Sequence, residues 1–428
     1  MQKVPVTCNK DCCAGCPLLA HVKDGRVTKI TNNPLRDQFV VGCVKGFHAL
    51  DVLYAKDRLK LPLLRTGYRG SGEFKEISWR EALARVAEKL DDLRMKEGSE
   101  SVLAFYGSGS CVSAVHNTGL LCKRFFSLFG GFTGQSDTYS CAAATFVQKY
   151  LFGTQMVGFD PPTLFKSNLI ILWGANLSDT RFSSRIETIL RRCKREGVPI
   201  IVIDPRCSNT VRRLATQWIP IRPGTDTAMM AAVLWVLLNE GGVDRKFTDT
   251  YTTGFEDLIS YVEGRTDGIV RDPSWASDIC GVPTDTITDF AHTYGSTKPT
   301  ALLPGWSLQR ALGGEETYRF TVALQAATGN IGKIGGSSGG EFWGGLPKPH
   351  IPQMPVPDTS DFPDIPVYKW PDAILGGPAR GYPTEIKAIY NCGTNRLNHV
   401  HQTLALKRVL GVHSPHHLKV VELDCRLP

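Results

Sequence analysis

Short apolar runs alternate with helical patterns between residues 168 and 242, and this alternation constrains the fold more than any other feature of the sequence. The runs NLIILW, PIIVID and QWIPI have the length and the branched residues of buried strands. The segments SSRIETILRRCKREG and TAMMAAVLWVLLNEGG have helical patterns that end at glycine. Strands that are apolar on both faces and alternate with helices predict a parallel, doubly wound α/β sheet.

Signals of the same kind flank this stretch. EISWREALARVAEKLDDLRMKEG predicts an amphipathic helix with Ser78 as N-cap, Glu81 three residues later and Gly98 at its end. SVLAFYG, EIKAIYNCGTN and HLKVVELD each contain a strand-like run, and HNTGLLCKRFFSLFGG has a helical pattern. The Gly- and Pro-rich residues 335–366 predict a long surface linker that returns to another domain. We find no internal repeat in the sequence.

Four cysteines near the start of the chain have the spacing of a metal site. Cys8-x3-Cys12-x3-Cys16, with Cys43 further on, supplies the four thiolates that a [4Fe–4S] cluster needs. The chain has 13 cysteines, and their crowding here favours metal binding over a disulfide scaffold. A structural zinc ion and unliganded thiols are the alternatives, and Cys13 can replace Cys12 because it would make a C-x2-C pair with Cys16. The following HVKDGRVTKITNN predicts a hairpin with an Asp-Gly turn.

The length of 428 residues suits two or three domains. We predict a cluster domain at 1–61, the first part of an α/β domain at 62–150, a Rossmann-like dinucleotide-binding domain at 151–335, and a linker with the return segment of the α/β domain at 336–428. HLKVVELD predicts a buried parallel strand with apolar residues on both faces, which needs a following helix to cover it. Only four residues follow this run, which is too few for such a helix. We therefore expect the last domain to be truncated.

Charge and hydropathy exclude two classes of partner. The net charge is +8, but the Lys and Arg residues are dispersed, which argues against a nucleic-acid-binding protein and favours attraction of a small anion or of a cofactor's phosphates. No apolar run is long enough for a membrane-spanning helix. Only seven residues precede Cys8, which is too few for a secretion leader, so we expect a cytoplasmic protein if Met1 is the native start. A periplasmic or outer-membrane-face location after removal of a leader is the alternative.

Polar groups follow the predicted parallel strands. No G-x-G-x-x-G motif is present, so the phosphate loop of a nicotinamide or flavin domain is missing. Asn176 follows the first strand, Asp204 ends the second, where a carboxylate can accept ribose hydroxyls, and Asp226 follows the third, where it can accept from a guanine edge. Ligands of such sheets bind at the carboxyl ends of the strands. The alternative is that both carboxylates only cap the helices that follow.

Taken together, these motifs resemble the catalytic subunit of the dimethyl-sulfoxide-reductase family of molybdopterin oxidoreductases, in its anaerobic sulfoxide-reductase branch. The four cysteines and Cys43-Val44-Lys45-Gly46 resemble its cluster motif. LIILWGAN, IVIDPR, WIPIRPGTDTAMM, PGWSLQRALGGEETYR, ATGNIGKIGG and IYNCGTN follow in family order. The resemblance covers essentially the whole chain, but members of the family continue further, through contacts to a second pterin and a barrel domain.

The resemblance implies two cofactors, a [4Fe–4S] cluster on Cys8, Cys12, Cys16 and Cys43 and a bis-molybdopterin guanine dinucleotide with Mo or W. It implies that Lys45 lies between cluster and pterin and assists electron transfer, where the plain alternative is a solvated surface lysine. The cofactor-binding residues that it implies are Lys45, Gly174, Asn176, Asp204, Pro205, Arg206, Pro223, Gly224, Asp226, Gly305, Trp306, Gln309, Arg310, Gly393 and Asn395.

The motif GGFTGQSDTYSCAAA implies Ser140 as the protein ligand of the metal, because the match runs without gaps from Gly130 through Tyr139. The adjacent Cys141 is the rival, since other branches of the family use cysteine and a thiolate is the softer ligand. Ligand softness by itself does not decide between the two residues. A plain helix start, with neither residue bound to metal, is the third possibility.

The function that the resemblance implies is oxygen-atom transfer from a small S-oxide or N-oxide during anaerobic respiration. Electrons would arrive through the cluster from an iron–sulfur electron-transfer subunit, and a membrane-anchor subunit is the other implied partner; neither nucleic acid nor a direct membrane span is expected. Formate oxidation, polysulfide or arsenate reduction and hydration are alternatives within the family. An inactive fragment that uses only the cluster is the alternative outside enzymes.

Overall fold

The computed structural model describes residues 1–10, 12, 14–68, 71–107, 117–155, 157, 158, 160–180, 184–341 and 352–394, together with the backbone of 419–423. The chain forms two compact units. The first unit contains residues 1–139 and 351–428, and the second unit contains residues 140–350. The second unit is thus a continuous segment inserted between the two segments of the first.

A parallel sheet of four strands, in the order β10-β9-β8-β11, is the centre of the second unit. This confirms the predicted parallel α/β architecture. The strands and helices of this unit are α5 (Ala142–Phe152), η2 (Pro161–Lys166), β8 (Leu169–Trp173), α6 (Ser184–Arg195), β9 (Ile200–Ile203), α7 (Asn209–Leu214), β10 (Gln217–Ile219), α8 (Asp226–Asn239), α9 (Arg245–Tyr251), α10 (Phe255–Val262), α11 (Pro273–Cys280), α12 (Thr284–Ser296), β11 (Thr300–Pro304), η3 (Trp306–Gln309) and α13 (Gly314–Ala327).

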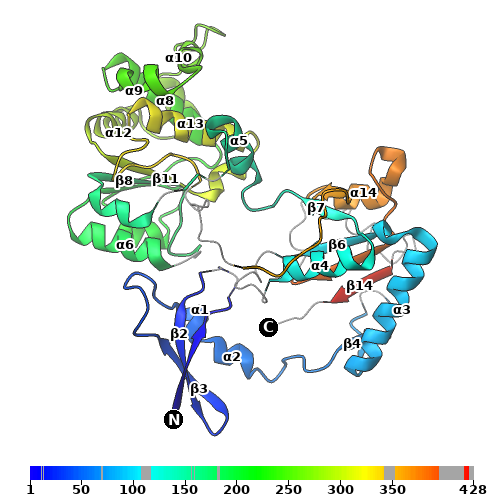
Figure 1. Ribbon diagram of the computed structural model, residues 1–428. Coiled ribbons are helices and arrows are strands. Elements are labelled where there is room, and N and C mark those ends of the chain that lie inside the picture. Colours follow the sequence, from blue (N-terminus) through cyan, green and yellow to red (C-terminus); the bar gives the residue numbers. More distant parts are fainter. Residues whose placement is uncertain are drawn as a thin grey trace. The chain divides into compact units, whose positions relative to one another are not determined.

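Helices cover both faces of this sheet, with α8, α12 and α13 on one side and α6 on the other (Figure 1). Leu169, Ile171 and Trp173 alternate along β8 and belong to the same buried cluster as the apolar residues of α8 and α12. Every residue of β8 is buried, as expected for a strand that is covered on both sides. The predicted helices at α6 and α8 are confirmed, whereas β11, a fully buried strand beside β8, was not predicted from the sequence.

The first unit begins with an antiparallel sheet in the order β1-β2-β3. Asp24 and Gly25 form the turn of the β2–β3 hairpin, and both have a positive φ, which confirms the predicted Asp-Gly turn. The elements of this unit are β1 (Gln2–Thr7), β2 (Pro17–Lys23), β3 (Arg26–Asn32), α1 (Val44–Phe47), α2 (Ala49–Leu53), β4 (Leu63–Arg65), β5 (Phe74–Glu76), α3 (Trp79–Glu97), η1 (Ser99–Ser101), β6 (Val102–Tyr106), α4 (Thr118–Phe129), β7 (Gly134–Ser136), β12 (Asp364–Pro366), α14 (Trp370–Gly376), η4 (Gly377–Arg380), β13 (Ala388–Cys392) and β14 (Lys419–Leu423).

A second parallel sheet, in the order β14-β13-β6, forms the core of the first unit. Successive residues of β6 point to opposite faces, as the two-residue period of a strand requires. Leu103 and Phe105 belong to one buried cluster with residues of α14, and Val102 and Ala104 belong to another with residues of α3 and α4. The Ser78 side chain accepts from the Glu81 N–H at 3.1 Å and caps α3 as predicted.

The two parallel sheets end in the same way. In the second unit Gly174 follows β8 and Gly305 follows β11; in the first unit Gly393 follows β13 and Gly107 follows β6. Gly174 has φ +62° and Gly393 has φ +63°. A Cβ on Gly305 would lie 1.9 Å from the Gly174 oxygen, and a Cβ on Gly107 would lie 1.9 Å from the Gly393 oxygen. The residues that follow the two strands are also alike, since Gly174-Ala175-Asn176 corresponds to Gly393-Thr394-Asn395.

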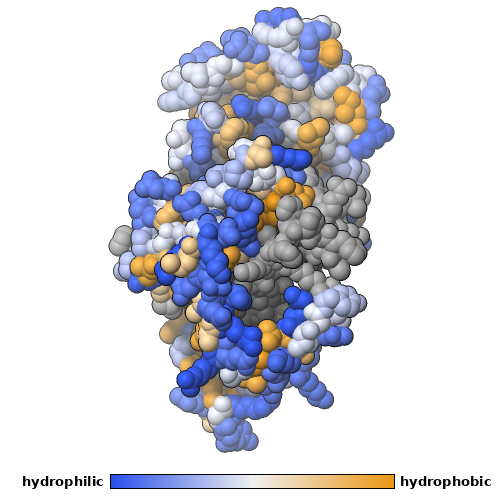
Figure 2. All heavy atoms as spheres, turned by 90° about the vertical axis from the view of Figure 1, so that its right-hand side faces the viewer, coloured by the Kyte–Doolittle hydropathy of each residue, from blue (hydrophilic) through white to orange (hydrophobic). Residues whose placement is uncertain are grey.

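The surface has the mixed character of a globular protein. On the face shown in Figure 2 hydrophilic residues predominate, and hydrophobic residues occur between them in small groups. Among the described residues, no helix combines the length and the hydropathy that crossing a membrane requires.

Candidate functional site

The cysteines of the predicted cluster motif lie at one end of the antiparallel sheet. Cys8 follows β1 and Cys16 precedes β2, and the Cys8 N–H donates to the Cys16 carbonyl at 2.9 Å. Cys12 lies in the loop that this bond closes, and Cys43 is the N-cap residue of α1. Cys13, the alternative to Cys12, lies outside the described residues. One short loop and one distant helix start therefore supply the four residues of the motif.

The four thiols lie within electrostatic reach of one another. Burial and the charges of the other three thiols raise the pKa of Cys16 to about 11. Burial, with contributions from Cys12 and Cys43, also raises the pKa of Cys8. Within the described residues, no three His, Cys, Asp or Glu side chains converge closely enough to hold a metal ion. Thiols with a raised pKa, such as Cys8 and Cys16, need a strongly positive group to become thiolates, and the iron atoms of a cluster would supply that charge.

Helix α1 places Lys45 two residues after Cys43. A Cβ on Gly46 would meet the Cys8 sulfur at 3.3 Å, so the glycine of the motif lets the helix approach the cysteine loop. The Lys45 side chain is exposed on this four-residue helix. The helix therefore displays a cation close to the cysteine loop, as the sequence motif predicts.

Side chains from α6 and α7 fix the loop that follows β8. The Asn176 amide nitrogen donates to Asp179 at 3.0 Å, and its oxygen accepts from the Thr210 hydroxyl at 2.6 Å. The Ser178 N–H donates to the same Thr210 hydroxyl, and the Ser178 hydroxyl donates to Glu187. Gly174, at the start of the loop, accepts from the Ser307 hydroxyl at 2.7 Å. The loop is thus held by hydrogen bonds at both ends.

Neither predicted carboxylate is the N-cap residue of the helix that follows it. Asp204 is buried and accepts from the Arg206 N–H at 2.8 Å, while Ser208 caps α7. Asp226 is the first residue of α8 and accepts from the Trp173 indole N–H at 2.9 Å. Burial raises the pKa of both carboxyl groups. Ser208 thus takes the capping role from Asp204, whereas the Asp226 carboxylate also interacts with its own backbone N–H in the first turn of α8. Asp204 lies beside the exposed Pro205 and Arg206.

The segment after β11 meets the strand ends from the other side. The Gly305 N–H donates to the Trp173 carbonyl at 2.7 Å, and a Cβ on Gly224 would meet the Ala311 side chain at 3.8 Å. These contacts bring the loops after β8, β10 and β11 together at the carboxyl edge of the sheet. This edge carries most of the predicted cofactor-binding residues of the second unit, including Gly174, Asn176, Asp204, Pro223, Gly224, Asp226, Gly305, Trp306, Gln309 and Arg310.

Gln309 links this edge to the start of α5. Its side-chain oxygen accepts from the Ala144 N–H at 3.0 Å, which satisfies one of the open donors in the first turn of α5. Its side-chain nitrogen is buried and has no hydrogen-bond partner in the described part of the chain. An unpaired buried donor is costly, so it fits a site at which a ligand supplies the acceptor.

Ser140 and Cys141 immediately precede α5, and Cys141 is its N-cap residue. Burial and the charge of Glu341 raise the pKa of Cys141 to about 11, while Arg310 opposes the shift. Glu341 is 4% exposed and accepts from the Trp306 indole N–H. Burial raises the pKa of Glu341. The sequence predicted Trp306 and Arg310 here but not Glu341, because the glutamate lies in the irregular 335–366 segment.

Two further residues at this position were also missed. Gln148 of α5 is fully buried and its side-chain oxygen accepts from the Glu341 N–H at 3.3 Å. The Tyr318 hydroxyl donates to the Gly305 carbonyl at 3.1 Å, and burial raises its pKa well above the usual value. Neither residue stands in a motif of polar residues. Both are identified only by their hydrogen bonds to residues that are distant in the sequence.

The corresponding strand ends of the first unit are partly described. A side chain at position 107 would clash with Gly393, because the backbones of Gly107 and Gly393 approach closely. The Asn391 amide donates to the Thr394 carbonyl at 2.8 Å and orders the start of the loop. Asn395, the remaining predicted residue here, lies outside the described residues.

Two family models match the chain. The model described as Molybdopterin oxidoreductase matches residues 58–412, and the model described as Molybdopterin oxidoreductase Fe4S4 domain matches residues 1–55. The chain belongs to the molybdopterin oxidoreductase family. The Fe4S4 match contains all four cysteines of the motif and Lys45.

Several members of the molybdopterin oxidoreductase family are similar to this chain. Dimethyl sulfoxide reductase DmsA from Haemophilus influenzae is 33% identical over 92% of this chain and 53% of its own length. Trimethylamine-N-oxide reductase from the same organism is 34% identical over 76% of this chain and 42% of its own length. Biotin sulfoxide reductase from Cereibacter sphaeroides is 33% identical over 81% and 51%. The chain thus spans about half the length of these relatives.

Among solved structures, acetylene hydratase from Pelobacter acetylenicus has a similar fold. It superposes with a TM-score of 0.62 and 25% identity over 77% of this chain and 44% of its own chain. The match agrees with the α/β fold class of the molybdopterin oxidoreductases.

The residues of both units fit the cofactors of this family. Four soft sulfur donors suit an iron–sulfur cluster. The close backbone approach of Gly174 and Gly305, the buried Asp204 and the unpaired Gln309 donor suit a bulky polar cofactor at the carboxyl edge of the second unit. The described residues therefore agree with the membership of the chain in the molybdopterin oxidoreductase family and with its Fe4S4 domain.

Proposed function

We propose that this chain carries the catalytic centre of a reductase that removes the oxygen atom from a small S-oxide or N-oxide. The observation that carries the proposal is the similarity, at 33–34% identity, to reductases whose names specify dimethyl sulfoxide, trimethylamine N-oxide and biotin sulfoxide. These substrates share one chemistry, because each gives up an oxygen atom from sulfur or nitrogen. The particular substrate is left to experiment.

Cys8, Cys12, Cys16 and Cys43 are the ligands that we propose for the [4Fe–4S] cluster. The loop that contains Cys8, Cys12 and Cys16, and the electrostatic effect of the other three thiols on Cys16, support this choice. Lys45 follows Cys43 on the same short helix, and its positive charge would favour arrival of an electron near the cluster. The electrons would come from an iron–sulfur partner subunit, with a membrane-anchor subunit as the further partner.

A bis-molybdopterin guanine dinucleotide with Mo or W is the second cofactor that we propose, and when bound it supplies the two-electron oxygen-atom chemistry. Ser140 is the proposed protein ligand of the metal and Cys141 is the alternative. The unbroken match of the motif from Gly130 through Tyr139 supports Ser140, and the softer thiolate of Cys141 supports the alternative. Gln309 fixes the first turn of α5 after this pair through its bond to Ala144.

The dinucleotide would lie along the carboxyl edge of the second unit. Asp204 and Asp226 supply carboxylate acceptors for ribose and guanine, and Arg206 supplies a cation for phosphate. Glu341 is bonded to Trp306 and Gln148, so it joins the segment after β11 to α5. These contacts keep the residues around Ser140 in one arrangement before a ligand arrives.

Metal, pterin and iron analysis of the anaerobically purified chain tests this proposal. We expect iron and sulfide in equal amounts, molybdenum or tungsten, and reduction of dimethyl sulfoxide, trimethylamine N-oxide or biotin sulfoxide by a reduced viologen dye. Ser140→Ala should abolish turnover and keep the iron content, whereas Cys13→Ser should keep both. Zinc in place of iron would disprove the cluster, and full activity of Ser140→Ala with an inactive Cys141→Ala would transfer the ligand role to the cysteine.

Hydration is the second candidate function. The similarity to the fold of acetylene hydratase, together with a partly buried cysteine at position 141, favours including it. A hydratase adds water to its substrate without net electron transfer. Turnover of acetylene in the absence of an electron acceptor or donor, without reduction of any of the three oxides, would favour this function over the reductase.

A further inference from the structure

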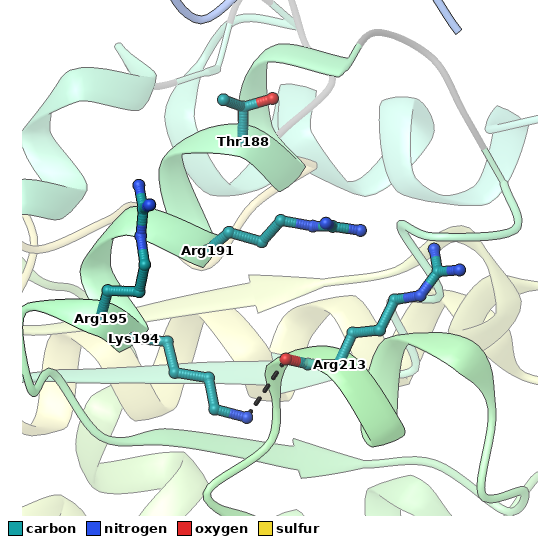
Figure 3. A pocket seen from close by; sticks show the side chains of 5 residues that line it. All are labelled: Thr188, Arg191, Lys194, Arg195 and Arg213. Carbon is teal, nitrogen blue, oxygen red and sulfur yellow. Dashed lines mark hydrogen bonds between the residues drawn. The ribbon is translucent and has the colours of Figure 1, made fainter. Parts of the chain in front are cut away.

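A hollow on the second unit is lined by four cationic side chains and one threonine. Its volume is about 570 Å³, within the range of about 300–1,000 Å³ that small-molecule sites occupy. Helix α6 contributes three of the cations and α7 the fourth (Figure 3). The lining residues are Thr188, Arg191, Lys194, Arg195 and Arg213.

A buried glutamate orders two of these arginines. Glu187 is 4% exposed, and its carboxylate accepts from Arg191 Nε at 3.1 Å and from Arg191 Nη2 at 2.7 Å. Arg213 Nη1 lies 3.8 Å from the same oxygen, which also accepts from the Ser178 hydroxyl. The two guanidinium groups are thus held by one fixed carboxylate. Cations that are positioned in advance lose less conformational entropy when they bind a ligand.

Neighbouring groups of the protein compensate only part of the positive charge of the hollow. Lys194 of α6 donates to the Arg213 and Ala215 carbonyls at 3.1 and 3.0 Å and so stabilises the negative end of α7. Arg191 and Arg213 remain about half exposed, at 49% and 48%. The Arg195 guanidinium makes no hydrogen bond or ion pair within the described part of the chain. Glu187 alone does not neutralise four cations.

We propose that this hollow binds an anion with two phosphoryl groups, either free or as part of a nucleotide. The planar fork of a guanidinium matches two oxygens of a phosphoryl group, and three guanidiniums and one ammonium suit two such groups. The residues lie toward the ends of α6 and α7, which lead to the amino ends of β9 and β10. None of the lining residues belongs to the loops of the proposed dinucleotide site, and the inference does not depend on the proposed function.

Calorimetric titration of the cofactor-loaded protein with pyrophosphate tests the proposal. Arg195→Ala should weaken binding about tenfold, because it removes a charge-assisted contact. Arg192→Ala is the matched control, since Arg192 lies in the same turn and is similarly exposed but pairs with Glu196 and does not line the hollow. Its affinity should equal that of the wild type. Binding should also weaken as salt is added.

Three outcomes would overturn the proposal: no binding of millimolar pyrophosphate, equal loss in Arg195→Ala and Arg192→Ala, or orthophosphate binding as tightly as pyrophosphate. Arg213→Ala provides a second variant, with the same expected loss, on the other helix. Titration with ADP separates the two sources of the anion. Equal affinity for ADP and pyrophosphate would support a free diphosphate ligand, and tighter binding of ADP would support a nucleotide.

Discussion

The two parallel sheets have the same backbone arrangement at their carboxyl ends but different side chains beneath it. In the second unit the residue before Gly174 is Trp173, whose indole donates to Asp226. In the first unit the residue before Gly393 is Cys392, whose thiol donates to the Phe105 carbonyl at 3.3 Å. The shared glycines let two loops approach closely, while the residues under them differ. The backbone thus makes room at both ends, and side chains determine what each end can bind.

Alanine at the inner glycines should have the largest effect. Gly305→Ala and Gly107→Ala each place a Cβ 1.9 Å from a backbone oxygen that cannot move without breaking a strand end. We expect each to lower the free energy of unfolding by on the order of 3 kcal/mol or more. Gly313→Ala is the control, since its site has a positive φ and open space, and should cost about 1 kcal/mol. Urea unfolding followed by fluorescence measures all three.

Unequal results would break the comparison. If Gly107→Ala unfolds at the same urea concentration as the wild type while Gly305→Ala does not, the two sheet ends are not equivalent. Equal large losses would establish the shared arrangement as a requirement of both units.

The asparagines that follow the glycines test the comparison at the level of side chains. Asn176→Ala removes a donor to Asp179 and an acceptor from Thr210, so we expect a loss of about 1–2 kcal/mol in unfolding free energy. It should also lower the pterin content, because the loop after β8 loses its anchor. Asn395→Ala should lower the pterin content to a similar extent if both ends hold the cofactor. Normal pterin content in both variants would contradict this use of the loops.

The sequence predicted the elements that rest on local signals. The helix at α3 has its cap residue, the β2–β3 hairpin has its Asp-Gly turn, and β8 and β9 are fully apolar runs. It did not predict β11, whose short run ends at a proline, although the buried Ile287, Phe290, Ala291 and Tyr294 of α12 directly before it have helical spacing. Family resemblance, rather than residue pattern, supplied Gln309 and Arg310.

The residues that the sequence did not reveal depend on contacts between distant segments. Glu341 is recognised only through its hydrogen bonds with Trp306 and Gln148. Its sequence segment, residues 335–366, has the composition of a linker. Asp204 and Asp226 were found, but their partners were not, since a carboxylate at the start of a helix also suits a cap. The match between the two sheet ends escaped notice because three residues, Gly-x-Asn, are too few to stand out without the register of the strands.

Replacement of Asp226, the first residue of α8, should change the free energy of unfolding by a smaller amount that depends on pH. Burial raises the pKa of Asp226 in the folded state, so the folded protein holds this proton more tightly than the unfolded chain does. The stability that follows from this is present below the unfolded pKa and is lost as the pH rises through the folded pKa. At pH 7 the charged Asp226 is therefore a net cost. Asp226→Asn keeps an oxygen that can accept from Trp173 and should be slightly more stable at pH 7.

The control for this change has the opposite sign. Hydrogen bonds from Asn209 and Asn176 lower the pKa of Asp179, so its contribution is present above the unfolded pKa and is lost as the pH falls through the folded pKa. Asp179→Asn should then be less stable than the wild type at pH 7. Urea unfolding between pH 2 and pH 7 should show the Asp226 difference shrinking as the pH falls toward 4, whereas the Asp179 difference should persist at pH 4 and shrink only below it, because its folded pKa is lowered. If Asp226→Asn is instead less stable than the wild type at pH 7, the hydrogen bond from Trp173 to the charged carboxylate outweighs the cost of its burial. If the variant is more stable but contains less guanine dinucleotide, the carboxylate serves ligand binding at the expense of the stability of the fold.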